Sequence, residues 1–139
     1  HYAIPEGFEP DEKIVSRAKE IAKVTGGAVK MTHDPVEAVK DANVVYTDVF
    51  VSMGEEDMKD KMDAFDGFQV NEELVSNADS EYIFMHCLPA HRGEEVTDGV
   101  IDSKNSVVFD QAENRMWAQM SLLTFLIHPA AWEAFSELH

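Results

Sequence analysis

The chain has 139 residues, which is the length of about one domain. It carries 27 acidic and 11 basic side chains, giving a net charge of −16 with histidine neutral, and 45% of its residues are hydrophobic. This composition supports a packed core. The acid excess argues against nucleic acid or an anionic membrane surface as a partner, because both need clustered lysine and arginine. The single cysteine argues against a disulfide framework and a cysteine-rich zinc site, and it favours a reducing, cytoplasmic compartment.

Turn and cap signals divide the chain into alternating elements. The first half predicts, in order, a strand-like triplet at 2–4, a helix opened by Asp11 and ended by Gly26, a strand at 28–32, a brief helix after Asp34, and a strand at 43–47. The second half predicts an acidic helix from about 55 to 65, a short helix at 72–78 capped by Asn71, a buried strand at 81–86, a loop at 90–97, a strand at 106–109, and a long helix from 110 or 111 that Pro129 stops.

Strands that alternate with helices predict an α/β domain with a doubly wound parallel sheet flanked by helices. Ligands of such sheets bind beyond the carboxyl ends of the strands. Three segments fall at that edge: Asp48 with the loop at 52–54, the turn at 86–89, and the segment from Asp110 to Arg115. We expect side chains from these segments to converge on one face.

Cys87 lies in the second of these segments and has several readings. A free cysteine is most often a small buried hydrophobe. Here it follows a strand and precedes Leu88-Pro89, which predicts an extended turn at the ligand edge. A nucleophilic pair with His86 or His91 is an alternative, although strand alternation would point His86 and Cys87 to opposite faces. A metal site formed by these three residues is a further alternative.

The other two segments also carry candidates. Asp48 either caps its strand or binds a cationic group at the sheet edge. Ser52 and Met53 form either a flexible turn or part of a binding loop. Arg115, near the start of a helix, either binds an anion or pairs with Glu113 or Glu133. Motifs typical of dinucleotide, P-loop and serine-hydrolase sites are absent from the sequence.

Four segments resemble ornithine carbamoyltransferases, in one order over nearly the whole chain. They are YTDVFVSMGEE (46–56), FQVNEEL (68–74), MHCLPAHRGEEVTD (85–98) and VVFDQAENRMWAQ (107–119). The SMG loop together with the HCLP turn distinguishes ornithine enzymes from aspartate carbamoyltransferases. The resemblance implies the aspartate/ornithine carbamoyltransferase fold. It also implies transfer of a carbamoyl group from carbamoyl phosphate to the side-chain amine of L-ornithine, in arginine biosynthesis or breakdown, with no cofactor and no metal.

The resemblance also assigns residues. Asp48, Ser52 and Met53 would bind ornithine. Cys87 and Leu88 would lie beside the reacting amine and the carbamoyl group, with Cys87 as the proton acceptor. Arg115 would contact carbamoyl phosphate. A primary amine with a pKa near 10 must lose a proton before it attacks a carbonyl carbon, and the departing phosphate needs positive donors, which explains these residue types.

Residues 1–139 then correspond to the C-terminal, ornithine-binding domain, truncated at its N-terminus because the chain starts at His1. The carbamoyl-phosphate domain, through which the family forms homotrimers, would be absent, and the piece alone would be inactive. A central strand would also be missing, so we expect an unpaired sheet edge. The stripe of Met116, Met120, Leu123 and Ile127 should then be partly exposed or buried against another chain.

Three rival functions remain open at this point. A sibling transcarbamylase would carry the same motifs and use a different amine acceptor. A non-catalytic amino-acid-binding module would retain the ornithine pocket alone. A thiol hydrolase would use Cys87 as its nucleophile.

Overall fold

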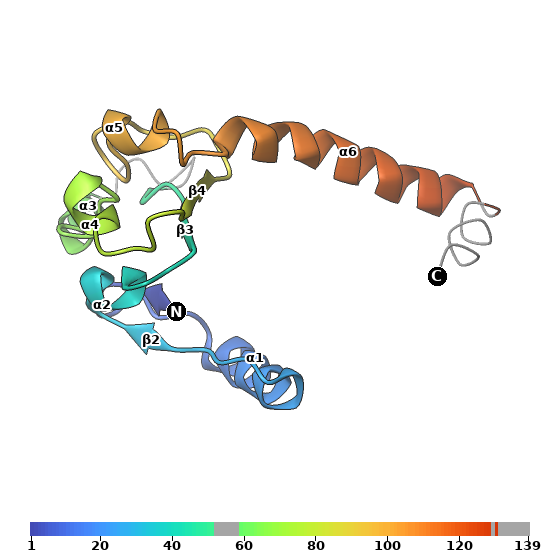
Figure 1. Cartoon of the computed structure of the whole chain (residues 1–139). Coiled ribbons are helices and arrows are strands. Elements are labelled where there is room, and N and C mark those ends of the chain that lie inside the picture. The colour runs from blue at the N-terminus through green and yellow to red at the C-terminus, as the bar shows by residue number, and fades with distance from the viewer. Residues whose placement is uncertain (52–58, 129, 131–139) are drawn as a thin grey trace.

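Strands and helices alternate along the chain, as the sequence predicts. The computed structural model describes residues 1–51, 59–128 and 130. Within them the elements are β1 (Tyr2–Ala3), α1 (Glu12–Thr25), β2 (Met31–Thr32), α2 (Pro35–Val39), β3 (Val44–Thr47), α3 (Lys59–Ala64), α4 (Glu72–Val75), β4 (Ile83–His86), α5 (Asp98–Ile101) and α6 (Val108–Ile127). Figure 1 shows their arrangement, with α1 and α6 at two extremities of the molecule. None of the helices described is both long and apolar enough to span a bilayer.

Local capping chemistry sets the helix ends that the sequence predicts. The Asp11 carboxylate accepts a hydrogen bond from the Lys13 N–H at 2.7 Å and begins α1. Gly26 ends the same helix in the left-handed region, with φ of 76°, where glycine carries no steric penalty. Asp34 and Asn71 cap α2 and α4 in the same way as Asp11. These predicted helix boundaries are confirmed.

The strands form two separate two-stranded sheets. β1 pairs with β2, and β3 pairs with β4, both in parallel. The residues that the structure describes therefore contain no continuous, fully paired sheet, which confirms the prediction of an unpaired edge. The expected doubly wound sheet is present as two parts, each with helices beside it.

Several predicted elements are shorter than expected. The predicted strand at 106–109 is wrong: Ser106 forms only an isolated bridge with Phe84, and α6 begins already at Val108. The strand predicted at 28–32 is observed over two residues, as β2, and the helix predicted at 72–78 over four, as α4. The described part of the predicted acidic helix is α3, and its earlier residues lie outside the described ranges. α5 was not predicted.

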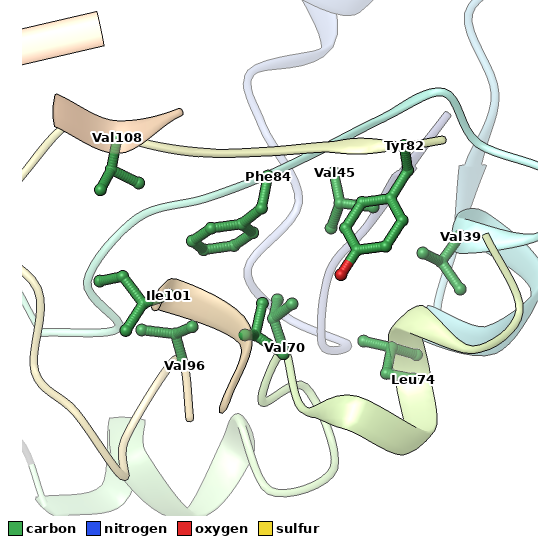
Figure 2. Close-up of a cluster of buried hydrophobic side chains, with 10 residues drawn as sticks. Val39, Val45, Val70, Leu74, Tyr82, Phe84, Val96, Ile101 and Val108 are labelled. Atoms are coloured by element: carbon green, nitrogen blue, oxygen red, sulfur yellow. The ribbon is translucent and has the colours of Figure 1, made fainter. Parts of the chain in front are cut away.

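One apolar core packs against a single face of β3 and β4. Val45 and Phe84 project from these strands toward side chains of the surrounding helices, as Figure 2 shows. The core consists of Val39, Val45, Val70, Leu74, Tyr82, Phe84, Val96, Val100, Ile101 and Val108. Phe84 is fully buried, which contributes about 1.5–3 kcal/mol relative to an exposed ring. The opposite face of the same strands carries the exposed side chains of Val44, Tyr46 and Ile83.

Helix α6 projects away from this core (Figure 1). Val108, in its first turn, is its buried residue, and the helix makes its main contact with β4. The predicted stripe of Met116, Met120, Leu123 and Ile127 is 48–76% exposed. This confirms the expectation that the stripe is not covered within a single chain.

Candidate functional site

The register of β3 and β4 brings two sequence-predicted side chains together. Thr47 pairs with His86 at the carboxyl ends of these strands, so the next residues, Asp48 and Cys87, leave the sheet side by side. The Cys87 Sγ donates a hydrogen bond to Asp48 Oδ1 at 3.0 Å. This contact joins residues 39 positions apart in the sequence. Two of the three predicted strand-end segments therefore meet.

The contact controls the protonation of the thiol. The hydrogen bond to Asp48 raises the pKa of Cys87 above its usual value, and burial and the charge of Asp48 raise it further. Cys87 is therefore a protonated thiol at neutral pH, and Asp48 is its acceptor. Asp48 is exposed, and its Oδ1 also accepts from the N–H of Val49 at 2.7 Å.

A buried imidazole–carboxylate pair lies directly behind this contact. The side chains of His86 and Glu95 are both fully buried, and His86 Nε2 lies 3.2 Å from Glu95 Oε1. The Leu88 N–H donates to His86 Nδ1 at 2.9 Å, which makes Nδ1 an acceptor. A neutral His86 therefore carries its proton on Nε2 and donates it to Glu95. Glu95 Oε1 also accepts from the His91 N–H at 2.6 Å.

The third strand-end segment joins the other two through a residue that the sequence did not single out. Gln111, in the first turn of α6, accepts a hydrogen bond from the His86 N–H at Oε1, at 3.1 Å. Its Nε2 donates to the hydroxyl of Tyr46 at 3.3 Å. Gln111 thus ties the start of α6 to both β3 and β4. It lies inside the segment from 110 to 115 that the sequence placed at this edge.

Arg115 lies one turn beyond Gln111 on α6 and shares its side of the helix, because residues four apart lie one above the other. Its side chain is exposed, and it forms no ion pair or hydrogen bond with any residue that the structure describes. It therefore does not contact Asp48 or Cys87. Glu133, one of its two suggested partners, lies outside the described ranges, and Glu113 is not paired with it.

The remaining sequence-predicted site residues have different outcomes. Ser52 and Met53 lie outside the described residues. Leu88 follows Cys87 with φ of 55°, so the expected extended conformation at this position is wrong. The bond from the Leu88 N–H to the imidazole of His86, together with packing of the Leu88 side chain against the core, holds this left-handed backbone in place.

The structure groups the candidate metal ligands and nucleophilic residues differently from the two alternatives that the sequence suggests. Ligand atoms of Asp48, His86 and Cys87 lie within 4.8 Å of one another, whereas His91 groups with Glu94 and Glu95. The predicted metal set of His86, Cys87 and His91 is therefore wrong. The predicted Cys–His pair does not form either, because the thiol bonds to a carboxylate and the His86 imidazole bonds to Leu88 and Glu95.

Aromatic rings hold the segment that follows Asp48. The ring of Phe50 stacks on Phe65 with centroids 4.7 Å apart, and Phe65 also meets Phe8 and Phe68 edge to face. A cavity of about 740 Å³ opens beside Phe50 and Phe65, and neither Asp48 nor Cys87 lines it. The cavity is therefore separate from the strand-end contact.

The fold and the strand-end contact define an α/β protein whose parallel strands carry a carboxylate, a thiol and a hydrogen-bonded turn at their carboxyl ends, the edge at which ligands of such sheets bind. The family described as aspartate/ornithine carbamoyltransferase, Asp/Orn binding domain, matches residues 1–126. The chain belongs to this family.

Known relatives show the same likeness. The chain is 58% identical over 128 residues to the catabolic ornithine carbamoyltransferase of Thermoplasma acidophilum, covering 91% of this chain and 42% of the relative. It is 58% identical over 126 residues to the ornithine carbamoyltransferase of Thermococcus kodakarensis, covering 90% of this chain and 40% of that protein. The chain thus spans about two fifths of the length of the curated relatives it matches.

Solved structures support the fold. The ornithine carbamoyltransferase from Pyrococcus furiosus superposes with a TM-score of 0.83 at 58% identity, over 88% of this chain and 39% of that one. An N-acetyl-L-ornithine transcarbamylase superposes with a TM-score of 0.74 at 28% identity, over 86% of this chain and 37% of that one. These matches confirm the family resemblance and the α/β fold class that the sequence predicts.

Proposed function

We propose that the chain supplies the ornithine side of an ornithine carbamoyltransferase site. A carbamoyl-phosphate-binding domain from outside residues 1–139 supplies the other side. The reaction transfers the carbamoyl group of carbamoyl phosphate to the side-chain amine of L-ornithine, giving L-citrulline and phosphate. The observation that carries the proposal is the Cys87–Asp48 contact at the paired strand ends. The 58% identity to two ornithine carbamoyltransferases supports the choice of substrate.

In this proposal Asp48 attracts the cationic ornithine, with Ser52 and Met53 as further ornithine-binding residues. The amine loses a proton, its lone pair attacks the carbonyl carbon, and the carbon–oxygen bond to phosphate breaks. Cys87 is the proposed proton acceptor, and for this role the thiol must first release its own proton to solvent, so that the thiolate takes the proton of the amine. An ammonium group placed beside the thiol opposes the effect of Asp48, because a nearby cation lowers a thiol pKa.

Leu88 and Arg115 form the carbamoyl-phosphate side of the proposal. Leu88 is fixed by His86 in the turn next to the thiol, which supports a position of its backbone beside the reacting group. The guanidinium of Arg115 is exposed and has no ion pair within the described part of the chain. It is available to an anion that approaches the strand ends, and its fork of donors suits phosphate oxygens.

The test has a binding arm and an activity arm. Isothermal titration of the chain with L-ornithine, N-acetyl-L-ornithine and putrescine should give binding of ornithine alone, and Asp48→Asn should abolish it. Citrulline should form only when a carbamoyl-phosphate domain is added. Preference for N-acetylornithine or putrescine would favour a sibling transcarbamylase. This second candidate function is supported by the N-acetyl-L-ornithine transcarbamylase structure at 28% identity. Binding without turnover in the combined protein would favour a non-catalytic module.

The assembly and setting follow from the same proposal. We place the intact enzyme in the cytoplasm, in arginine metabolism, as a homotrimer or a multiple of trimers. The free thiol of Cys87 suits a reducing compartment. Light scattering of the chain joined to its carbamoyl-phosphate domain should give the mass of three chains or a multiple of three, and a monomer would contradict the assembly.

A further inference from the structure

The turn that follows β4 is held from beneath by a fully buried side chain. Leu88 comes directly after Cys87 and has φ of 55°, in the left-handed region. A residue with a Cβ atom adopts this region at a cost, so the conformation persists only where surrounding contacts hold it. The Leu88 N–H donates to Nδ1 of His86 at 2.9 Å. The conformation of this turn therefore depends on one imidazole nitrogen.

The ring of His86 is fixed at its other nitrogen by Glu95. Both side chains are fully buried, and Nε2 of His86 lies 3.2 Å from Oε1 of Glu95. The same oxygen accepts from the His91 N–H at 2.6 Å, which ties the carboxylate to the loop after the turn. An ionised carboxylate can only accept hydrogen bonds, so it favours a proton on Nε2 and leaves the Nδ1 lone pair for Leu88. The two hydrogen bonds of the ring thus support each other.

The main chain of His86 is anchored as well. Its N–H donates to Oε1 of Gln111 at 3.1 Å, and the residue pairs with Thr47 at the end of β3. Backbone and side chain of His86 are therefore held by three different elements or loops. A residue fixed at this many points can hold the next two residues in one arrangement.

We propose that His86 is a positioning residue for carbamoyl transfer, that it acts through Leu88, and that Glu95 keeps the imidazole in the required orientation and tautomer. This inference rests on the function proposed above. While Nδ1 accepts from Leu88, the turn keeps its left-handed residue and Cys87 stays beside Asp48. Without that bond Leu88 relaxes toward ordinary backbone angles, and the thiol and the Leu88 carbonyl are displaced together. The reaction then slows, because transfer requires aligned reacting groups.

Two amide substitutions separate the roles of the two ring nitrogens. Asparagine places its carbonyl oxygen near the position of Nδ1, and glutamine places its amide nitrogen near the position of Nε2. His86→Asn therefore keeps an acceptor for the Leu88 N–H and loses the bond to Glu95. His86→Gln keeps the bond to Glu95 and loses the acceptor. The glutamine side chain fills more of the buried space, so His86→Gln should be the more stable variant in urea.

Citrulline formation by the chain joined to its carbamoyl-phosphate domain measures the effect on the reaction. His86→Gln should lower kcat about tenfold to a hundredfold, the size expected when a reacting group is misplaced by about 1 Å, with a smaller change in KM for L-ornithine. His86→Asn should lose less activity than His86→Gln although it is the less stable variant. The control is His91→Gln, at an exposed side chain whose Nδ1 lies 3.8 Å from Glu94, and it should leave kcat unchanged.

Alkylation of Cys87 by iodoacetamide tests the turn without any substrate. Displacement of the thiol from Asp48 removes their hydrogen bond, so His86→Gln should react nearly as fast as Asp48→Ala. His86→Asn should stay near the rate of the parent chain. If the parent joined to its carbamoyl-phosphate domain forms no citrulline, the proposed function fails, and the alkylation rates still decide whether His86 holds the turn.

Nitrogen NMR of the histidine-labelled parent chain tests the geometry even if both variants unfold. At neutral pH, Nδ1 of His86 should be an unprotonated acceptor, hydrogen-bonded to the Leu88 N–H. A protonated Nδ1 would exclude the bond on which the inference rests. Equal kcat in His86→Asn and His86→Gln, or a kcat that follows their stability, would assign His86 a structural role alone. A comparable loss in His91→Gln would mean that the reaction responds to any change in this loop, and would also overturn the proposal.

Discussion

Glu95 is the acceptor for two donors beneath the proposed site, and its replacement should destabilise the chain. Glu95→Ala leaves the buried His86 Nε2–H and the half-buried His91 N–H without their acceptor. An unsatisfied buried donor costs about 1–3 kcal/mol, and the half-buried amide about 1 kcal/mol. The expected loss in the free energy of unfolding is therefore about 2–4 kcal/mol.

Two further variants at the same position separate hydrogen bonding from cavity formation. Glu95→Gln keeps a carbonyl oxygen where Oε1 accepts both bonds, although its amide NH2 replaces the buried Oε2, which has no partner among the described residues, so its loss should be smaller than that of Glu95→Ala. Glu95→Leu fills the same space without an acceptor, so it should resemble Glu95→Ala. Urea unfolding followed by far-UV circular dichroism measures all three. With a slope of about 2 kcal/mol per molar urea, the alanine and leucine midpoints should fall by about 1–2 M.

The reasoning fails if the leucine variant is as stable as the glutamine variant. That result would mean that the two donors find water or another acceptor at no cost, and that the pair does not fix the turn. A glutamine variant as unstable as the alanine variant would point to the charge of Glu95, and not its acceptor geometry, as the stabilising property.

Three other predictions follow from the fold and the site. Asp48→Ala should speed alkylation of Cys87 by iodoacetamide at pH 7–8, because loss of the hydrogen bond and of the negative charge lowers the thiol pKa. The thiolate fraction then rises, and a slower or equal rate would contradict this. Phe84→Ala should reduce the free energy of unfolding by about 3–5 kcal/mol, while Phe109→Ala, at a side chain 74% exposed, should change it by less than about 0.5 kcal/mol in the same urea titration. Amides in the last two turns of α6 should exchange with solvent faster than those of β4, and equal protection would show that α6 is covered in solution.

The features that the sequence predicts correctly depend on local chemistry or on strand ends. The capping side chains of Asp11, Asp34 and Asn71 accept hydrogen bonds from backbone N–H groups two or three residues further along the chain. Sequence spacing is therefore sufficient to find these caps. The meeting of Asp48 and Cys87 follows from parallel pairing, because both residues come directly after a strand. Neither inference needs knowledge of how helices and loops pack.

The features that the sequence missed depend on tertiary packing. Glu95 lies in a polar stretch with no periodicity, and only the packing of that stretch against β4 buries it beside His86. The sequence around Gln111 is typical of an exposed helix residue, and its hydrogen bond to the His86 N–H forms only because α6 packs against the strand ends. The strand predicted at 106–109 has suitable residues, but the backbone from Val108 onward enters the helix, so one bridge is all that forms.

The projection of α6 away from the core has a thermodynamic consequence. Its 20 residues extend about 30 Å, and among the residues that the structure describes Val108, in the first turn, is the one buried on this helix. Most helical stability in proteins comes from tertiary packing, so the exposed far turns of α6 should fray more readily than the first turn. A partner that covers the apolar stripe must therefore order the frayed turns of α6 as it binds. Part of the gross contact energy is then spent on this ordering, and a covalent link or staple that prestiffens α6 should tighten the complex.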